Sequence, residues 1–494
     1  MRAYDAVVVG GGHNGLVAAA YLGRAGKRVL VLERLDRVGG AAVSARPFDG
    51  VDARLSRYSY LVSLLPPRIV DELDLSIRLA RRRYSSYSPD PRTGGRTGLL
   101  IGPHSGIAED FYRRCGLLTR ALWPTMTEPL PTRSRARKLV DADASWRVMV
   151  EEPIGHAITS AVSDDLVRGV IATDALIGTF ASLDDDSLRQ NVCFLYHLLG
   201  GGTGDWDVPV GGMGAVTDAL TAAARRHGVD IACGADVFAI TPDGEVRYRD
   251  GDVERSVHGS AVLAGVTPTV LASMLGEVPP MAAPGCQVKV NLMLRRLPRL
   301  RDTSVTVEQA FGGTFHINET FSQLEAAYTQ AAGGKVPDPL PCEIYCHSLT
   351  DPSILSADLA ASGAQTLTVF GLHTPHGLGG REALTDAVLA SLNSVLAEPI
   401  QDVLMPGCIE TRTTTDLEAT LGMTAGHIFH GGLTWPFAED DEPLDTPALR
   451  WGVATAHERI LLCGSGSRRG GGVSGIGGHN AAMALLESGS LAES

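Results

Sequence analysis

The first forty residues constrain the fold most, because they contain a strand, a glycine cluster, a helix and a second strand in that order. The β-branched run 6–9 predicts a buried parallel strand, and 16–25 predicts a helix that ends at Gly26. Residues 28–32 predict the next strand. Between the first strand and the helix lie three glycines with G-x-G-x-x-G spacing, Gly10, Gly12 and Gly15. This order predicts a Rossmann-type unit.

Each part of this unit has a role in binding a dinucleotide. Gly10 permits a tight turn, Gly12 lets the backbone approach a pyrophosphate, and Gly15 allows the helix to pack closely on the strand. Phosphate is favoured at the helix N-terminus by free N–H groups and the helix dipole. Glu33 follows Gly15 by eighteen residues, where an acid is expected to bond ribose hydroxyls. We therefore predict a dinucleotide site, and the alternative is a Rossmann-like scaffold that has lost its ligand.

A second glycine-rich segment lies almost at the other end of the chain. Residues 460–463 predict a strand, which a glycine loop joins to a helix through Leu486. Glycine removes side chains that would collide with a flat cofactor ring, and the helix N-terminus, expected near Val473 and Ser474, can stabilise negative charge on that ring. Taken alone, a glycine loop before a helix is usually only a turn.

The middle of the chain contains another unit of this kind. Residues 208–240 read as a glycine turn, an amphipathic helix to about His227 and a strand that carries Val237. Turns at 243–244 and 250–251 then predict a hairpin-like stretch. The alternative is an αβ unit unrelated to the site.

Length and charge exclude several classes of protein. A chain of 494 residues is expected to form two or three domains. A net charge of −13 argues against nucleic acid as a partner, and we interpret the basic run 133–138 as a solvated loop. No apolar run in the sequence approaches the roughly 18 to 20 residues that span a bilayer.

Cysteine usage and the first residues bear on the compartment. The eight cysteines have no C-x-x-C spacing, so reduced thiols are expected. The chain begins directly with an apolar strand, which argues against a signal peptide. We expect a cytoplasmic protein, and we leave peripheral membrane contact and a homodimer open.

The chain resembles the phytoene desaturase-related FAD-dependent oxidoreductases, and most of all the branch of pyridine nucleotide-disulfide oxidoreductase domain-containing protein 2. Seven segments carry this resemblance: YDAVVVGGGHNGL, VGGAAVS, SRYSYLVSLLPP, VPVGGMG, QVKVNLMLRRLP, GHIFHGGLT and LCGSGSRRGGGVSGIGGHNAA. It implies FAD as the cofactor, because Gly39 and Gly40 follow Glu33 as in the E-x5-GG extension of these proteins.

This chain departs from the pattern at two places. Ser465 stands where many related flavoproteins have an acid that holds the ribityl chain. Ser467, Arg468 and Arg469 stand where the branch commonly has Thr-His-Pro. A disulfide reductase is not expected, because the sequence has neither a C-x-x-C pair nor a second strand-linked G-x-G-x-x-G.

The resemblance implies an α/β fold, with a Rossmann-type FAD-binding domain of the glutathione reductase-like, amine oxidase or phytoene desaturase type and an inserted α+β substrate domain. We predict the FAD-binding domain over 1–75, 206–285 and 425–494, and the substrate-binding domain over 76–205 and 286–424. The expected cofactor-binding residues are Gly10, Gly12, Asn14, Gly15, Glu33, Arg34, Gly39, Gly40, Ala41, Val237, Gly464, Ser465, Gly472 and Val473.

The expected function is that of an FAD-dependent dehydrogenase or desaturase. It would oxidise a C–C or C–N bond of a small organic substrate by hydride transfer to flavin N5, with oxygen or a quinone-like compound as the electron acceptor. One alternative is a redox-neutral isomerase or cyclase that uses bound flavin. The other is a non-catalytic, flavoprotein-like scaffold.

Two residues are candidates for catalysis. His430 is preferred among the histidines because its motif adjoins the flavin segment. Lys289 is the second candidate because some amine oxidases hold a water near flavin N5 with a lysine, although a lysine that points to solvent from an edge strand is the alternative. The expected substrate contacts are Tyr58, His316, Phe429 and Trp435.

No metal is predicted. Cys342, Cys346 and His347 lie close together in the sequence, but they lack a fourth ligand and a recognisable spacing.

Overall fold

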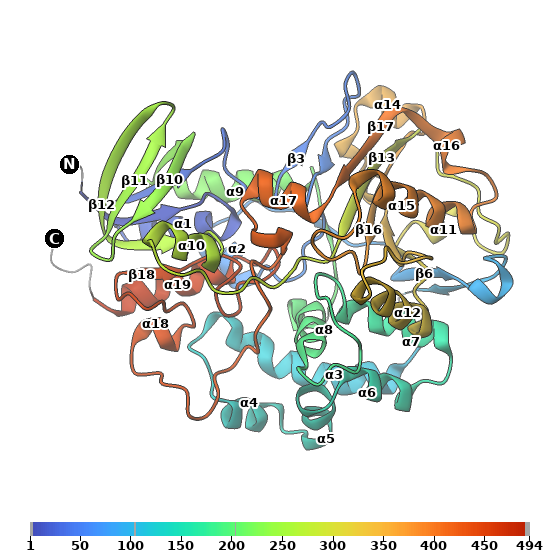
Figure 1. Cartoon of the computed structure of the whole chain (residues 1–494), viewed down its shortest axis with the longest axis horizontal. Helices are drawn as coiled ribbons and strands as arrows, with labels where there is room; N and C mark the ends of the chain where they lie inside the picture. The colour runs from blue at the N-terminus through green and yellow to red at the C-terminus, as the bar shows by residue number, and fades with distance from the viewer. Residues whose placement is uncertain (1–2, 103–104, 203, 490–494) are drawn as a thin grey trace.

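The computed structural model describes residues 3–102, 105–202 and 204–489, which form two sheets and a layer of helices (Figure 1). The first sheet, here called the Rossmann sheet, contains β1 (Ala3–Val9), β2 (Val29–Glu33), β9 (Asp230–Cys233), β10 (Ala235–Ile240), β11 (Glu245–Asp250), β12 (Val253–Ala264) and β18 (Ile460–Leu462). Its order is β10-β11-β12-β1-β2-β9, and β18 pairs with β12. Strands β18, β12, β1, β2 and β9 pair in parallel, whereas β10, β11 and β12 form an antiparallel meander.

Helices cover both faces of the Rossmann sheet. One face packs against α1 (His13–Arg24), α2 (Pro67–Glu72), α9 (Met213–Arg226), α18 (Pro447–Arg450) and α19 (Ile476–Glu487), and the other packs against α10 (Pro268–Leu275). Because both faces are covered, β2 is buried along its whole length, as the apolar sequence VLVLE requires. Helix α1 begins three residues earlier than expected, since Gly12 is its N-cap in an extended conformation.

The second sheet has strand order β17-β13-β16-β15-β14-β6-β7. These strands are β6 (Ser86–Pro89), β7 (Gly98–Ile101), β13 (Val288–Leu294), β14 (Thr314–Ile317), β15 (Cys342–Tyr345), β16 (Gln365–Gly371) and β17 (Leu404–Arg412). All neighbours are antiparallel except β14 and β6. Two short pairs complete the strands, β3 (Ser44–Ala45) with β4 (Leu55–Ser56), and β5 (Leu79–Ala80) with β8 (Val208–Pro209).

The remaining helices fall into two groups. One group lies between or after the strands β13 to β17 in the sequence: α11 (Val307–Ala310), α12 (Phe321–Ala332), α13 (His347–Thr350), α14 (Ala357–Ala361), α15 (Arg381–Val395), α16 (Ile400–Val403) and α17 (Thr414–Leu421). The other, here called the helical layer, consists of α3 (Glu109–Leu122), α4 (Arg133–Val140), α5 (Asp143–Trp146), α6 (Ile154–Ala161), α7 (Asp165–Ala172) and α8 (Arg189–Leu199). Figure 1 shows the helical layer along the bottom of the molecule.

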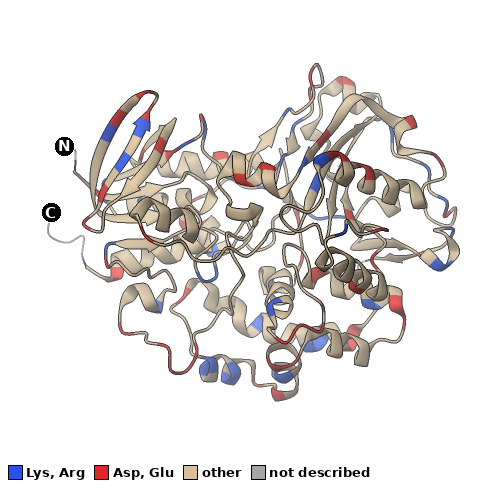
Figure 2. Cartoon of the chain, viewed as in Figure 1, with Lys and Arg blue, Asp and Glu red and all other residues tan. Residues whose placement is uncertain are grey.

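The basic run 133–138 lies in α4 and is not a loop, so that interpretation is wrong. Thr132 caps this helix by accepting a hydrogen bond from the Arg135 N–H, and only Ala136 and Val140 of the helix are buried. Its basic side chains therefore lie on the outward face of a surface helix. Figure 2 shows this blue helix among acidic and basic residues that are spread over the whole cartoon.

The expected α/β class, with a Rossmann-type domain and an α+β insertion, is confirmed. Strands of the Rossmann sheet come from residues 3–33, 230–264 and 460–462, and strands of the second sheet come from 86–101 and 288–412. The exact domain boundaries stay a prediction. Among the described residues, no helix combines the length and apolar character that crossing a membrane requires.

The close crossing of α1 and α19 allows a test of stability. A Cβ on Gly478 would lie 1.9 Å from the backbone oxygen of Asn14, so Gly478→Ala must push the two helices apart. We expect it to lower the free energy of unfolding by about 1–3 kcal/mol or more, measured by thermal or urea unfolding. The matched control is Gly116→Ala in α3, where a Cβ meets only the mobile end of Arg120. That variant should be neutral or up to ~1 kcal/mol more stable, and equal effects at both positions would contradict the account.

Candidate active site

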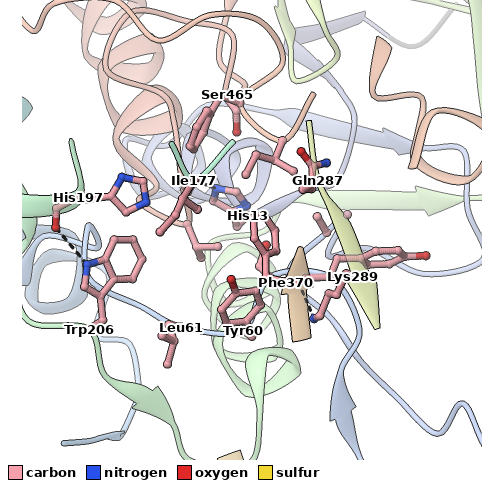
Figure 3. Close-up of a pocket in the computed structure, with 18 of the residues that line it drawn as sticks. His13, Tyr60, Leu61, Ile177, His197, Trp206, Gln287, Lys289, Phe370 and Ser465 are labelled. Carbon is pink, nitrogen blue, oxygen red and sulfur yellow. Dashed lines mark hydrogen bonds between the residues drawn. The ribbon is translucent and has the colours of Figure 1, made fainter. Parts of the chain in front are cut away.

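A cavity of about 940 Å³ lies between the Rossmann sheet, the second sheet and the helical layer. This volume is at the upper end of the range of roughly 300–1,000 Å³ for ligand sites. The ends of β1 and β2 line one part, here called the cofactor end, together with the C-terminal glycine loop. Strands of the second sheet and residues of α7 and α8 line the rest, here called the substrate end. Figure 3 shows Ser465 near the top of this cavity and Tyr60 and Lys289 near the bottom.

The glycines after β1 shape the cofactor end. Gly10 has a φ of +100°, a conformation that favours glycine, and a Cβ on Gly15 would lie 2.2 Å from the Gly10 oxygen. A Cβ on Gly12, by contrast, meets nothing within 4 Å. The backbone at Gly12 therefore faces open space at the start of α1, where the helix presents its free N–H groups.

Glu33 places a carboxylate at the end of β2. It is buried, its Oε2 accepts a hydrogen bond from the Gly11 N–H at 2.7 Å, and its Oε1 accepts one from the Leu35 N–H at 2.9 Å. These bonds fix the carboxylate beside the glycine loop, where it lines the cavity.

Direct contacts join the two ends of the chain at this point. His13 Nε2 lies 3.0 Å from the Gly472 oxygen, and Asn14 Nδ2 donates to the Gly470 oxygen at 3.2 Å. Asn14 Oδ1 is buried and has no hydrogen-bond partner among the described residues. Helix α19 begins at Ile476, slightly later than expected, because Gly475 takes a left-handed conformation before it.

Thirteen of the fourteen expected cofactor-binding residues line the cavity, and Gly39 does not. Gly39 has a φ of +125°, and its N–H donates to the Gly11 oxygen at 2.8 Å. A Cβ there would lie 2.5 Å from Val43 Cγ1. Gly39 therefore packs against the glycine loop on the side away from the cavity. Gly40 is the one of the pair that approaches the cofactor end, with its Cβ position 3.2 Å from Gly12 Cα.

The expected substrate contacts have different positions. Tyr58, His316 and Phe429 line the cavity. Trp435 does not line it, because its partly buried ring stacks on Phe437 at 5.7 Å and packs against the core of the helical layer. The prediction of Trp435 as a pocket residue is therefore wrong in this structure.

His430 also lines the cavity. Its φ is +61°, and its Nδ1 has no hydrogen-bond partner in the described part of the chain. Burial lowers the pKa of His430 to about 4, followed by smaller effects of His13 and His427. The imidazole is therefore neutral at physiological pH.

Lys289 is buried in the cavity wall. It lies on β13, which pairs with β16 on one side and β17 on the other, so its strand is internal. Its Nζ donates to the backbone oxygens of Ser56 at 2.6 Å and Tyr58 at 2.7 Å, and it lies 4.8 Å from the centre of the Tyr60 ring. Burial lowers the pKa of Lys289 well below its ordinary value. The alternative of an exposed lysine on an edge strand is wrong.

Sequence reasoning missed much of the substrate end, whose further lining residues include Tyr60, Arg82, Asp174, His197, Trp206, Gln287, Glu343, Tyr345 and Phe370. Figure 3 shows the Trp206 indole donating to the backbone oxygen of His197, a bond of 3.0 Å. Most of these residues stand alone in the sequence and come together only in the fold. Glu343 did give a signal, since it is an acid within the otherwise apolar strand CEIY.

Several of these polar side chains contact one another. His316 Nδ1 lies 2.6 Å from Glu319 Oε2, and the Tyr345 hydroxyl donates to Glu343 Oε2 at 2.6 Å. Burial, followed by the charge of Glu319, raises the pKa of Glu343 to about 7. Burial lowers the pKa of His316 to about 4, although the charge of Glu343 opposes this.

Cys342, Cys346 and His347 do not come together as a metal site. The Cys342 thiol donates to the Leu340 oxygen, whereas Cys346 contacts Ser348. In the described ranges, the group whose ligand atoms could hold an ion is His316, Glu319 and Glu343.

Known proteins resemble the chain at the level of both sequence and fold. Residues 8–68 match the NAD(P)-binding Rossmann-like domain family. An uncharacterized protein of Mycobacterium tuberculosis (strain ATCC 25618 / H37Rv) is 66% identical over 98% of this chain and 97% of its own length. Pyridine nucleotide-disulfide oxidoreductase domain-containing protein 2 of Rattus norvegicus is 28% identical, and the alignment covers 97% of this chain and 92% of the rat protein.

Solved structures share the fold. An oxidoreductase from Methanosarcina mazei has a TM-score of 0.61 at 16% identity, over 98% of this chain and 99% of its own. Putrescine oxidase bound to putrescine has a TM-score of 0.58 at 17% identity, over 98% of each chain. The residues of the cofactor end, the fold and these relatives together identify a site for a flavin or nucleotide cofactor. The chain therefore belongs to the family of the mycobacterial protein, and its likeness to pyridine nucleotide-disulfide oxidoreductase domain-containing protein 2 supports an oxidoreductase enzyme.

Proposed function

We propose that this oxidoreductase binds FAD and oxidises a C–C or C–N bond of a small organic molecule. One observation carries the proposal: a single cavity joins the glycine loops from both ends of the chain to a polar and aromatic substrate end. A substrate at that end would lie next to a cofactor held by the loops. The two-electron acceptor would be the flavin ring of FAD, through hydride transfer to N5. The likeness to putrescine oxidase, whose name refers to an amine, supports a C–N bond.

The residues of the cofactor end fit FAD. The open space at Gly12 and the N-terminus of α1 suit the pyrophosphate, and the fixed carboxylate of Glu33 suits the ribose hydroxyls. Val237 would lie near the adenine. The unpartnered Asn14 Oδ1 offers a further polar contact.

The two arginines that depart from the family pattern, Arg468 and Arg469, do not fill the cavity. Arg469 is buried elsewhere and donates to the backbone oxygens of Thr125 and Glu128, each at 2.7 Å. Arg468 donates to Glu442 at 3.0 Å. Neither arginine lines the cavity, so neither argues for a scaffold without turnover. Ser465 does line it and can still hydrogen-bond the ribityl chain, although it brings no charge.

Lys289 is the best-placed proton acceptor of the two candidates. A neutral amine has two N–H groups, and the backbone oxygens of Ser56 and Tyr58 accept both. The nitrogen lone pair is then free to take a proton from the substrate or to hold a water molecule. His430 would position the substrate from another part of the cavity wall. Reduced cofactor would pass its electrons to oxygen or to a quinone-like acceptor.

The role of Gly12 can be tested by filling its open space. Gly12→Val should fold normally, because a Cβ there meets no atom within 4 Å. It should weaken FAD binding by about 100-fold or more, or ~2.7 kcal/mol, measured by flavin absorption and titration of the apoprotein. Gly380→Val is the matched control, since Gly380 also has open space and lies outside the cavity. Equal FAD affinity in both variants would argue against this binding site.

The role of Lys289 can be tested once a substrate has been found by screening amines and other small molecules. Lys289→Met should keep bound flavin but slow its anaerobic reduction by substrate about 100-fold or more. Lys335→Met, at an exposed lysine, should react like the wild type. A Lys289→Met variant that retains flavin and full rate would remove Lys289 from the mechanism.

Burial of the cavity histidines predicts how stability depends on pH. It lowers the pKa of His13, His197, His316 and His430 from 6.5 to about 4 each. The unfolded chain therefore binds more protons than the folded chain between these values, and stability is lost as the pH falls from 6.5 towards 4. The loss is at most about 1.4 kcal/mol per histidine and pH unit.

Unfolding midpoints measured at several pH values check this prediction. His197→Gln should flatten the slope, whereas His156→Gln, at an exposed position, should leave it unchanged. A His197→Gln slope equal to that of the wild type would contradict the lowered pKa of His197.

A further inference from the structure

Two neighbouring strands bring a histidine and two glutamates together at the substrate end. His316 on β14 lies directly opposite Glu343 on β15 in antiparallel register, so both side chains project from the same face of the sheet. Glu319 follows β14 and returns its carboxylate to the same point. One ligand atom of each residue lies within 4.8 Å of the other two.

All three side chains are almost fully buried, with 6% exposure for His316 and 2% for each glutamate. Hydrogen bonds fix Glu343, since Oε2 accepts from Tyr345 and Oε1 accepts from the Thr173 hydroxyl at 3.3 Å. Glu319 Oε2 contacts His316 Nδ1, but Glu319 Oε1 has no partner among the described residues. A buried carboxylate oxygen without a donor is costly, and it indicates a missing positive ligand.

Nearby side chains do not supply this positive charge by contact. Arg82 is the cation that faces the group, but its guanidinium donates to the Trp206 oxygen at 3.0 Å and to Thr314 Oγ1 at 2.7 Å. Its charge also acts on the carboxyl groups of Glu343, Asp207 and Asp174, with Glu343 first, but no hydrogen bond joins it to Glu343 or Glu319. Two buried carboxylates beside a neutral imidazole would be balanced by one divalent cation.

We propose that His316 Nδ1, one oxygen of Glu319 and one oxygen of Glu343 bind a divalent transition-metal ion of the Mn²⁺, Fe²⁺ or Zn²⁺ class. The ion would take the place of the proton between His316 and Glu319. A mixed set of imidazole and carboxylate donors suits these ions better than Ca²⁺ or Mg²⁺, which prefer oxygen alone. The site was not expected from the sequence, because its residues are separated by up to 27 positions.

Access to the cavity indicates what such an ion would bind. His316 and Glu343 line the cavity, whereas Glu319 does not. A substrate ammonium group in the cavity therefore has no direct route to Glu319, but an ion between the three side chains reaches it. The remaining coordination positions would face the cavity and bind water or an oxygen of the substrate, such as a hydroxyl, carbonyl or carboxylate.

The test measures metal binding without any substrate. Purified full-length protein is stripped with a chelator and titrated with Mn²⁺, Zn²⁺ and Co²⁺, with bound metal measured by mass spectrometry and Co²⁺ also by visible absorption. We expect one ion per chain. Glu319→Gln and Glu343→Gln, which keep the shape of the side chain, should bind the ion at least about ten-fold more weakly.

His197→Gln is the control, because His197 lies in the wall of the same cavity but outside the ligand group, and this variant should bind metal like the wild type. Unfolding midpoints verify that each variant folds.

Two results would overturn the proposal: a wild type without stoichiometric metal, or glutamine variants with unchanged affinity. A wild type without metal, together with a Glu319→Gln variant of increased stability, would show that the group holds a proton instead. Metal binding is independent of FAD, so this failure would leave the proposed function untouched.

Discussion

The contact between α1 and α19 is the constraint on which the site depends. These helices lie at opposite ends of the chain, and they can approach because Gly478 has no side chain where the Asn14 backbone passes. The same contact brings Gly470 and Gly472 within hydrogen-bond distance of Asn14 and His13. Without it, the two glycine loops would not share one cavity. The crossing of these helices therefore holds two segments that are far apart in the sequence in fixed positions around the cofactor end.

The substrate end depends on a different arrangement. The second sheet places its polar side chains on internal strands, where the protein covers them from both sides. Burial then changes their chemistry: it favours a neutral Lys289 amine and leaves Glu319 with an unsatisfied oxygen. Both features lower the stability of the folded protein. We therefore interpret the substrate end as a functional region.

Local patterns predicted which residues would lie together at the cofactor end, because each of its parts is continuous in sequence. The glycines after β1, Glu33 and the C-terminal loop each follow a strand at fixed spacing, and this spacing places them at the sheet edge. The substrate end could not be predicted in this way. Lys289 appeared to lie on an edge strand, because the sequence around it does not reveal that β16 and β17 flank it.

The same reason explains the other errors and omissions. Trp435 is close in sequence to Phe429, but its ring turns into the helical layer to stack on Phe437. The ion-binding group joins β14 to β15, a register that only the folded sheet sets. Cavity residues that distant parts of the chain bring together were missed, whereas residues placed by local spacing were predicted and line the cavity.

The identity of the cofactor is the central claim, and one measurement tests it most directly. The visible absorption spectrum of the purified protein, with the released cofactor identified by mass, should show FAD bound at about one molecule per chain. A colourless protein that also fails to take up added FAD would contradict the account, because a cavity shaped by both glycine loops would then serve some other ligand.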